Sequence, residues 1–424
     1  MKKLWLCIIS VCLLSCSFIS LKSVNTSHDI NEIWDKTIKE YLLDEQWTSD
    51  YIYDAGHALL IPMVASFELK NKEWKDQFYY FFERYLTEYK KDENGIDKST
   101  LNYTQFLFLI SNYVALANDY EESTDLVDGL ESMLYDELLR IWNEPAWIWD
   151  HPDFENMGER LKWKLDTKNV ERSYYRVIFD VDWYMFGIAA NLCSDSKYKE
   201  EKAIQDILDL AYRYFYQESI FTASDGWLIQ QGVWSDHPDY AYAGNTEKNE
   251  NIERLPVYNL AWDSSHFHRM PAILRSLRSA HASDTEEYQF YDKLIHSLAN
   301  QFMNEVYVEP NNQFNGVRLT NFMDGWNGIY RWNYATTAKE NDGIGPYENS
   351  GTYLFGWWSL LEDERITNTY SQMAELFPLD DNVIKTYVGP NTTRNRHEMV
   401  AQPNLYENGY SELICRLVSE IYEN

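Results

Sequence analysis

The chain has 424 residues, of which 37 are Lys or Arg and 67 are Asp or Glu, so its net charge is −30. A charge of that sign argues against nucleic-acid binding, which needs a basic surface. The sequence holds 33 Tyr and 16 Trp. Buried ring stacks explain most of these, and those outside helical segments are candidates for stacking against sugar rings.

The first 16 residues predict an export signal. Two lysines follow Met1, and the apolar stretch after them is too short to span a membrane stably. The junction Leu13-Leu14-Ser15-Cys16 resembles the bacterial lipobox, which implies cleavage before Cys16 and lipidation of that cysteine. Cleavage by an ordinary signal peptidase is the alternative. Residues 17–29 would form a flexible tether, and the exported protein would be lipid-anchored in a Gram-negative cell envelope.

Apolar residues at three- and four-residue spacing predict about twelve helices, and no alternating pattern predicts a strand. Charge-laced amphipathic helices, such as 72–90, alternate with helices that are apolar on most faces, such as 178–193. This alternation predicts a single all-α domain over residues 30–424, an (α/α)6 toroid of inner and outer helices, with an α-solenoid as the alternative. The expected helices are 30–43, 55–69, 72–90, 103–119, 123–142, 178–193, 199–218, 262–280, 284–306, 350–361, 366–377 and 408–422.

The motif Asp-x-x-His-x-x-x-x-Pro occurs twice, beginning at Asp54 and at Asp263. Each copy leads into an apolar helical run, so the motif marks the start of a buried helix. We expect Asp54 and His57 of the first copy to be structural. The second copy adds His268 and Arg269 to its histidine, and this difference points to function in the second copy.

Three long connections, 143–177, 219–261 and 307–349, precede buried helices and exceed the usual length of structureless loops. We expect all three to lie over one mouth of the domain. They are rich in Trp, Tyr, Asp and Asn, which is typical of a surface that binds sugars. The candidate substrate-binding residues in them are Trp227, Gln230, Gln231, Trp234, His237, Tyr242, Trp326, Trp332 and, at the end of the third, Glu348.

Acids at the starts of buried helices are the candidates for chemistry, although capping the helix is an equally simple use for each of them. Asp182 has apolar neighbours that would desolvate its carboxyl and raise its pKa toward that of a general acid. Asp263 and His266 offer an imidazole oriented by a carboxylate, and His268 and Arg269 follow directly. Such a set suits proton abstraction beside a carboxylate-bearing sugar, with the arginine neutralising the charge.

Four short motifs resemble the unsaturated glucuronyl and rhamnogalacturonyl hydrolases. They are Asp182-Trp-Tyr-Met185, Asp225-Gly-Trp-Leu-Ile-Gln-Gln-Gly232, the Trp262-headed helix and Glu348-Asn-Ser-Gly351. The resemblance implies an (α/α)6 toroid in which Asp182 is the general acid/base that protonates the vinyl-ether bond of an unsaturated uronic acid. The family usually has a second Asp ahead of the preceding inner helix, where this chain has Asn102.

The same region is also similar to toroidal polysaccharide lyases. The shared residues are Asp225-Gly-Trp-Leu-Ile-Gln230-Gln231 and Tyr242-Ala-Gly244, with Gln231 in place of the lyase histidine. In a lyase, His237 or His266 would therefore serve instead, with Tyr240 or Tyr242 as the acid/base.

The sequence therefore predicts a carbohydrate-active enzyme that cleaves oligosaccharides, namely a glycoside hydrolase acting on uronate-containing glycans. Asp182, His266 and Asp263 are its predicted catalytic residues. A polysaccharide lyase and a non-catalytic glycan-binding lipoprotein are the alternatives. We expect no cofactor and no metal, a glycan and the membrane as partners, and at most one disulfide, between Cys193 and Cys415.

Overall fold

The computed structural model describes residues 29–91, 96–98, 100–122, 124–149, 153–194 and 197–423. The predicted signal peptide, the lipidation site Cys16 and residues 17–28 of the predicted tether lie outside the described residues. Helices make up most of the described chain, which confirms an all-α protein. None of its described helices is both long and apolar enough to cross a membrane.

Every helix expected in the first half of the chain is present. The described helices there are α1 (Ile30–Trp34), the π-helical turn η1 (Asp35–Lys39), α2 (Glu40–Leu43), α3 (Ile52–Ala58), α4 (Leu60–Glu68), α5 (Lys72–Lys91), α6 (Thr100–Asp119), α7 (Asp125–Asn143), α8 (Met157–Asp166), η2 (Ser173–Arg176), α9 (Asp180–Cys193) and α10 (Lys202–Glu218).

The second half contains shorter elements. They are η3 (Pro238–Tyr240), α11 (Ser264–Phe267), α12 (Met270–Ser279), α13 (Glu286–Gln301), the π-helical turn η4 (Phe302–Val306), η5 (Ser350–Phe355), η6 (Trp357–Leu361), α14 (Glu364–Ala374), α15 (Asp381–Val388), η7 (Glu398–Val400), α16 (Asn404–Glu407) and α17 (Tyr410–Glu423). Two antiparallel strand pairs, β1 (Ser219–Phe221) with β2 (Trp227–Ile229) and β3 (Tyr307–Val308) with β4 (Arg318–Leu319), lie in the long connections.

Two local expectations differ from the structure. The segment 350–361 is a pair of 3-10 helices, because Gly356 between them has a left-handed φ of 82° that ends the first helix. The long connections also hold regular structure of their own, including α8 and the two strand pairs. The sequence analysis predicted no strands, and that prediction was wrong for these short segments.

The apolar helices pack on one another in chain order. Contacts join α4 to α6, α6 to α9, α9 to α12, α12 to η6 and η5 to α17, and α17 also contacts α4 near the start of the domain. Every residue of α9 is buried. The amphipathic helices α5, α7, α10, α13 and α14 cover this buried set, since each turns its apolar face to it.

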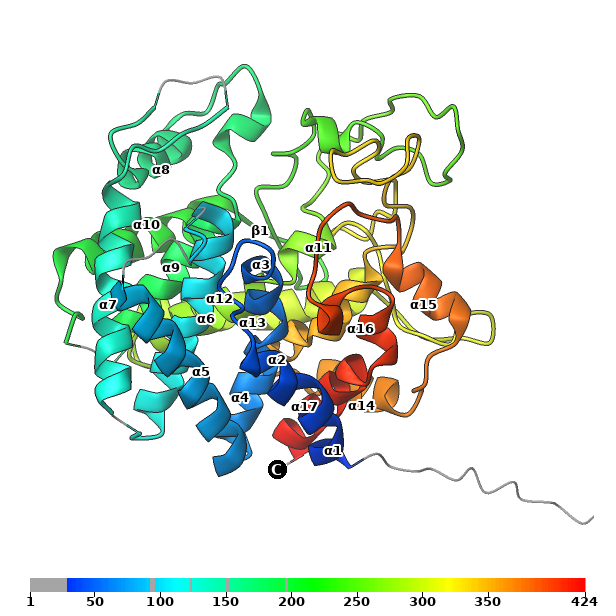
Figure 1. Ribbon diagram of the computed structural model, residues 1–424. Helices are drawn as coiled ribbons and strands as arrows, with labels where there is room; N and C mark the ends of the chain where they lie inside the picture. The colour runs from blue at the N-terminus through cyan, green and yellow to red at the C-terminus, as the bar shows by residue number, and fades with distance from the viewer. Residues whose placement is uncertain are drawn as a thin grey trace, which may run out of the picture.

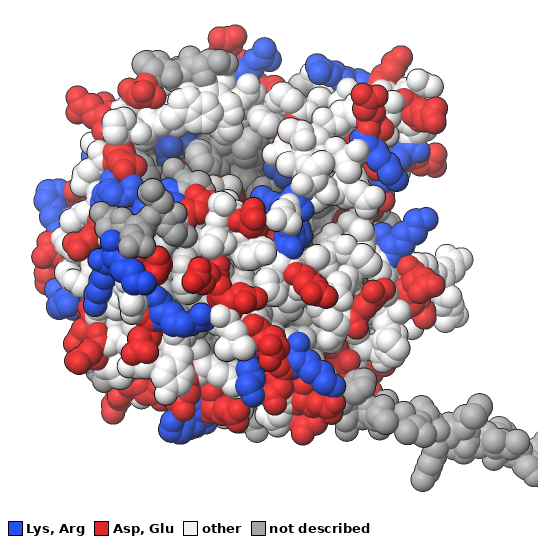
Figure 2. Space-filling view, viewed as in Figure 1, with Lys and Arg blue, Asp and Glu red and all other residues white. Residues whose placement is uncertain are grey.

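The long connections gather on one side of the helices. Figure 1 shows α8 and its flanking chain at the upper left, and the segments around residues 240 and 335 at the upper right, above the helical body. In the space-filling view the surface is hollowed between these two projections (Figure 2). In Figure 1, α9 and α11 lie below these two projections.

Candidate functional site

A pocket of about 330 Å³ lies between the starts of buried helices and the long connections. One side of it is polar and the other is aromatic. Its lining residues are Leu101, Trp147, Trp149, Phe179, Asp180, Trp234, His237, Asp239, Tyr240, Trp262, Asp263, His266, Tyr330, Arg331 and Tyr334.

Asp263 and His266 lie at the centre of the polar side. Asp263 precedes α11, and its carboxylate accepts a hydrogen bond of 3.0 Å from the backbone N–H of His266. Both carboxylate oxygens also lie 2.9 Å from the ring nitrogen Nδ1 of His266. Nδ1 is therefore the protonated nitrogen that donates a hydrogen bond to Asp263, and whenever the ring is neutral its lone pair is on Nε2.

The Asp263 carboxyl is held in its ionised form. Its burial would raise the pKa, but the charge and hydrogen bond of His266 and the charge of Arg331 outweigh burial, and the pKa lies below its ordinary value. The Tyr240 hydroxyl also donates a hydrogen bond of 2.9 Å to this carboxylate. A fully buried carboxylate with these donors fixes the position and the tautomer of His266.

Tyr330 places a second hydroxyl beside the imidazole. Its oxygen lies 3.4 Å from Nδ1 of His266, and that nitrogen already donates to Asp263. The Tyr330 proton is therefore available to a group in the pocket. Burial raises the pKa of Tyr330 well above its ordinary value, so the hydroxyl stays protonated at neutral pH.

Two hydrogen bonds to Asp239 hold Arg331 at the edge of the pocket. Its Nε donates to Asp239 Oδ2 at 2.9 Å, and its backbone N–H donates to the Asp239 carbonyl at the same distance. The guanidinium also lies 3.5 Å from Nε2 of His266. The φ of Arg331 is 54°, a left-handed conformation that a side chain of this kind rarely adopts. Such strain is typical of a residue held in place for function.

Hydrogen bonds join the two long connections that carry these groups. Trp326 donates its indole N–H to the Ala243 carbonyl at 2.7 Å, and the backbone N–H of Ile329 donates to the Asn245 carbonyl at 2.8 Å. At Gly328 a Cβ atom would lie 1.7 Å from the Ala243 oxygen, so only glycine permits this approach. The contact brings Tyr330 and Arg331 to the segment of Asp239 and Tyr240.

Asp180 forms part of the floor of the pocket, and buried Arg269 lies behind it. An ion pair joins their side chains, and Asp180 is 8% exposed. Arg269 also donates to Nε2 of His57 at 3.2 Å and to the Tyr53 hydroxyl at 2.9 Å. His57 is therefore a buried structural partner of Arg269. This is consistent with the expectation for the first copy of the repeated motif.

Indole and phenol rings make the other side of the pocket. Trp149 is in edge contact with Trp234 at 6.1 Å between ring centres, and Trp234 stacks on Tyr240 at 5.6 Å. Trp147 lies 5.6 Å from Trp149 and is 53% exposed. An apolar ring left in water beside polar groups is typical of a surface that stacks on sugar rings.

Asp182 lies outside this pocket. It has no exposed surface, and its carboxylate is paired with Arg160 and with Lys164 at 3.4 Å. It also accepts the backbone N–H of Phe179 at 3.2 Å, which caps α9. Burial lowers the pKa of Lys164 to about 7, although the nearby Asp182 charge opposes this. We correct the expectation that Asp182 faces substrate: it is a capping residue, and Asp180 occupies the pocket in its place.

The other candidates divide into two groups. Trp234 and His237 line the pocket, and burial lowers the pKa of His237. His268 and Arg269 lie behind its floor, and Gln230 bonds the backbone at Ile178 and Arg176, which is a structural role. The remaining candidates do not line the pocket: Trp227 is in the core, Gln231 lines a separate groove, Glu348 pairs with Lys248, and Tyr242, Trp326 and Trp332 lie in the neighbouring loops.

Sequence reasoning missed several lining residues. Asp239, Tyr330 and Arg331 are the polar ones, and Trp147 and Trp149 are the aromatic ones. The signal that could have found Arg331 is its place in a Gly- and Trp-rich connection, where an arginine has no core to pack against. Nothing local in the sequence pairs it with Asp239.

The described residues contain no group of three or more His, Cys, Asp or Glu side chains placed to hold a metal ion. Cys193 and Cys415 are both buried and free, so the one possible disulfide is not formed. Comparison with known proteins found no protein-family model that matches the chain and no curated protein that matches it.

Proposed function

We propose that this protein is a carbohydrate-active enzyme that cleaves uronate-containing oligosaccharides by β-elimination in the pocket of His266 and Arg331. The observation that carries the proposal is the arrangement of these two side chains. An imidazole oriented by a buried carboxylate faces a clamped guanidinium within one aromatic pocket. A base next to a carboxylate-binding arginine is what removal of a proton beside a uronate carboxyl requires.

We also propose that the domain is an (α/α)6 toroid. The contacts between successive buried segments support it, because they run from α4 through α6, α9, α12 and the η5–η6 pair to α17, and α17 contacts α4 again. A solenoid would leave the first and last buried helices apart. Lipidation at Cys16 and attachment to the cell envelope remain part of the proposal, on the motif alone.

Elimination fits the pocket better than hydrolysis by an Asp general acid. Hydrolysis needs a carboxyl group that is protonated at working pH. The three carboxylates of the pocket each have a positive or donating partner: Asp180 has Arg269, Asp239 has Arg331, and Asp263 has His266. For Asp263 these partners lower the pKa and keep the carboxylate ionised, and none of the three carboxylates lacks such a partner. This favours the lyase alternative over the hydrolase.

The proposed reaction assigns one step to each group. A uronate carboxylate is a stronger acceptor than a neutral ring nitrogen, so it takes the Arg331 N–H groups and frees Nε2 of His266. Nε2 then removes the proton from the carbon next to the carboxylate. The electron pair forms a carbon–carbon double bond as the bond to the glycosidic oxygen breaks, and Tyr330 donates its proton to that oxygen. Arg331 stabilises the charge that develops on the carboxylate.

Uronate polysaccharides such as alginate, pectate and the glycosaminoglycans test this directly. We expect new ultraviolet absorbance from the unsaturated product with at least one of them, and a loss of about 10² to 10⁴ in kcat for His266→Ala. His296→Ala is the matched control, because that histidine is exposed and far from the pocket along the chain.

Other outcomes decide between the alternatives. Release of saturated sugars, or consumption of an already unsaturated uronide, would show hydrolysis instead. Glycan binding without any product would support the non-catalytic lipoprotein.

A further inference from the structure

A second cavity of about 350 Å³ lies at the other ends of the same helices. It is bounded by α6, α9 and α12 near their last turns, whereas the His266 pocket lies near the starts of α9 and α11. Asp180 in the first pocket and Asn191 in the second are eleven residues apart on α9, which is about 16 Å along the helix. The two cavities are therefore separate sites.

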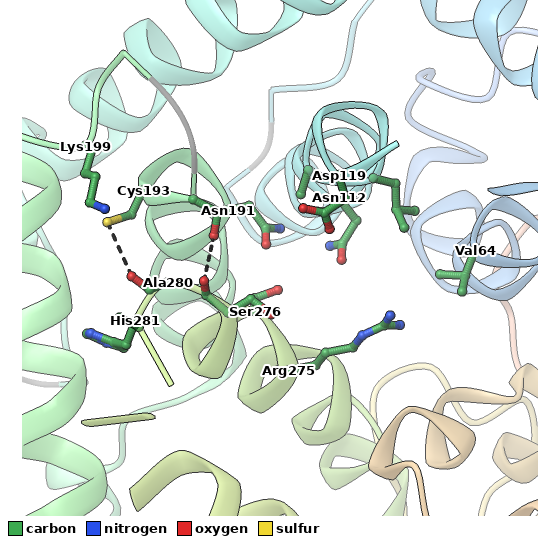
Figure 3. A pocket seen from close by; sticks show the side chains of 15 residues that line it. Val64, Asn112, Asp119, Asn191, Cys193, Lys199, Arg275, Ser276, Ala280 and His281 are labelled. Carbon is green, nitrogen blue, oxygen red and sulfur yellow. Dashed lines mark hydrogen bonds between the residues drawn. The ribbon is translucent and has the colours of Figure 1, made fainter. Parts of the chain in front are cut away.

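Uncharged polar side chains form the floor of this cavity. Asn191 and Ser276 are buried, with 5% and 4% exposure, and Asn112 lies beside them. In Figure 3 these three side chains, from α9, α12 and α6, turn toward the space between the helices.

Each of the three retains unused hydrogen-bonding capacity. The Asn191 amide donates to Ser111 Oγ at 2.9 Å, and the Asn112 amide donates to the Phe108 carbonyl at 2.8 Å. These bonds fix both amides with Oδ1 left over. Among the described residues, no hydrogen bond reaches either Oδ1 or the Ser276 hydroxyl. The Ser276 hydroxyl and the two amide oxygens are therefore accessible from the cavity and open to a ligand.

Charged groups lie only at the rim. Arg275 already has Glu68 at 3.4 Å and Glu362 at 3.6 Å as partners. Asp119, at the end of α6, and Lys199, in the turn before α10, are both exposed. The cavity therefore has no strong net preference for an anion. Its floor requires a ligand that donates several hydrogen bonds and can also accept some.

Aliphatic side chains form another part of the lining. Val64, Ala115, Leu116 and Ala280 present aliphatic surface to the cavity. A sugar ring has this same division, with hydroxyl groups around its edge and C–H groups on its faces. The cavity volume lies at the low end of the range for small-ligand pockets and suits one or two such rings.

We propose that this second cavity binds an uncharged mono- or disaccharide through Asn112, Asn191 and Ser276. The proposal stands on the cavity itself and goes beyond the proposed reaction. Sugar hydroxyls donate to the two amide oxygens and exchange hydrogen bonds with the Ser276 hydroxyl, while C–H faces contact the aliphatic side. The exposed Asp119 and Lys199 reach hydroxyls at the opening.

Titration of the whole protein with D-glucose, D-galactose and cellobiose tests the proposal, by calorimetry and ligand-observed NMR. We expect at least one of the three to bind with a Kd of about a millimolar, because an open site offers the sugar only a few hydrogen bonds. Ser276→Leu fills the cavity and removes its free hydroxyl, so it should weaken binding by at least about tenfold. His266→Ala, at the other pocket, should leave this affinity unchanged.

If Ser276→Leu does not fold, a crystal structure of the unaltered protein soaked with the sugar that binds tests the proposal instead. Sugar density between Asn112, Asn191 and Ser276 would establish the site. The proposal is wrong if none of the three sugars binds, if binding survives Ser276→Leu in a folded protein, or if His266→Ala abolishes it. Tight binding of a diamine such as putrescine in place of sugar would also overturn it, since the acceptors would then serve a cation. Loss of lyase activity alone would leave it standing.

Discussion

The chemistry at the residue scale depends on pairs of side chains, not on single acids. Asp263 alone is an N-terminal cap of a short helix, and His266 alone is a partly exposed histidine. Together they form a base whose tautomer is fixed, because both oxygens of the carboxylate lie at 2.9 Å from one ring nitrogen. Asp182 shows the opposite case, since its partners remove it from any ligand.

Asp263→Asn tests the orientation of the base. An amide can accept from Nδ1 only through its oxygen, and the negative charge that stabilises the protonated ring is lost. We expect kcat to fall by about 10² to 10⁴ with a KM that changes by less than about tenfold. Steady-state kinetics on the best uronate substrate measures both. A smaller loss should follow Tyr240→Phe, which removes one donor from the same carboxylate. Equal activity in the Asn variant would contradict the role of Asp263.

Arg331→Lys tests recognition of the carboxylate. Lysine keeps the charge but loses the planar donors that hold Asp239 and reach a uronate. We expect KM to rise by at least about tenfold, with the larger effect on KM than on kcat. Arg365→Lys is the control, because that arginine is 46% exposed on α14 and bonds Asp363 at the surface. An unchanged KM would remove Arg331 from substrate binding.

At the scale of elements, the start of α9 combines two carboxylates with opposite tasks. Asp180 faces the pocket and Asp182 faces the interior, because residues two apart on a helix point to different sides. The sequence favoured Asp182 as the residue that faces substrate. That prediction depended on the apolar neighbours of Asp182. The sequence could not show that Arg160 and Lys164 of α8 lie under Asp182.

Asp182→Asn should therefore act on stability. It leaves buried Arg160 without its carboxylate partner and removes the charge that holds the proton on Lys164, and breaking a buried pair of this kind costs about 3 to 5 kcal/mol. Urea unfolding measures that loss. Asp166→Asn is the matched control, since that carboxylate is 64% exposed and should contribute less than about 1 kcal/mol. A stable Asp182→Asn protein that has lost turnover would instead restore the catalytic assignment.

The helices themselves were predictable because their apolar spacing reports burial directly. All twelve expected helical segments contain helix, and the chain around residues 350–361 differs only in being 3-10. The long connections were the weaker part of the prediction. The regular structure in these connections depends on contacts with other elements, such as the bonds from Arg160 to Asp182 and from Arg176 to Glu218, and carries little periodicity of its own.

At the scale of the whole molecule, buried histidines make stability depend on pH. Burial lowers the pKa of His268 to about 3, and the charge of Arg269 adds to this, while His57 is lowered well below its ordinary value. In the unfolded chain these rings have pKa values near 6.5 and bind protons more readily. The unfolded state therefore gains protons first as pH falls, so stability decreases from about pH 6.5 toward 3.

His268→Gln tests this dependence. A glutamine keeps a neutral polar group near the Ser265 carbonyl but does not titrate. The free energy of unfolding, measured in urea at several pH values, should fall less steeply in the variant over that window, by up to about 1.4 kcal/mol per pH unit. His296→Gln, at an exposed position, should keep the slope of the unaltered protein. Parallel slopes in all three proteins would show that His268 is not buried as a neutral ring.

The helical class, the alternation of buried and half-exposed helices, and the local pair of Asp263 with His266 could be predicted from the sequence, because they depend on residues within one or two helical turns. The folded chain was needed to show which helix starts share a pocket. Arg331 is 92 residues from Asp239, and Arg269 is 89 residues from Asp180. Partners so far apart are chosen by how the connections fold over the helices, and spacing along a chain does not carry that information. The same reason placed Asp182 in the interior and Asp180 in the pocket.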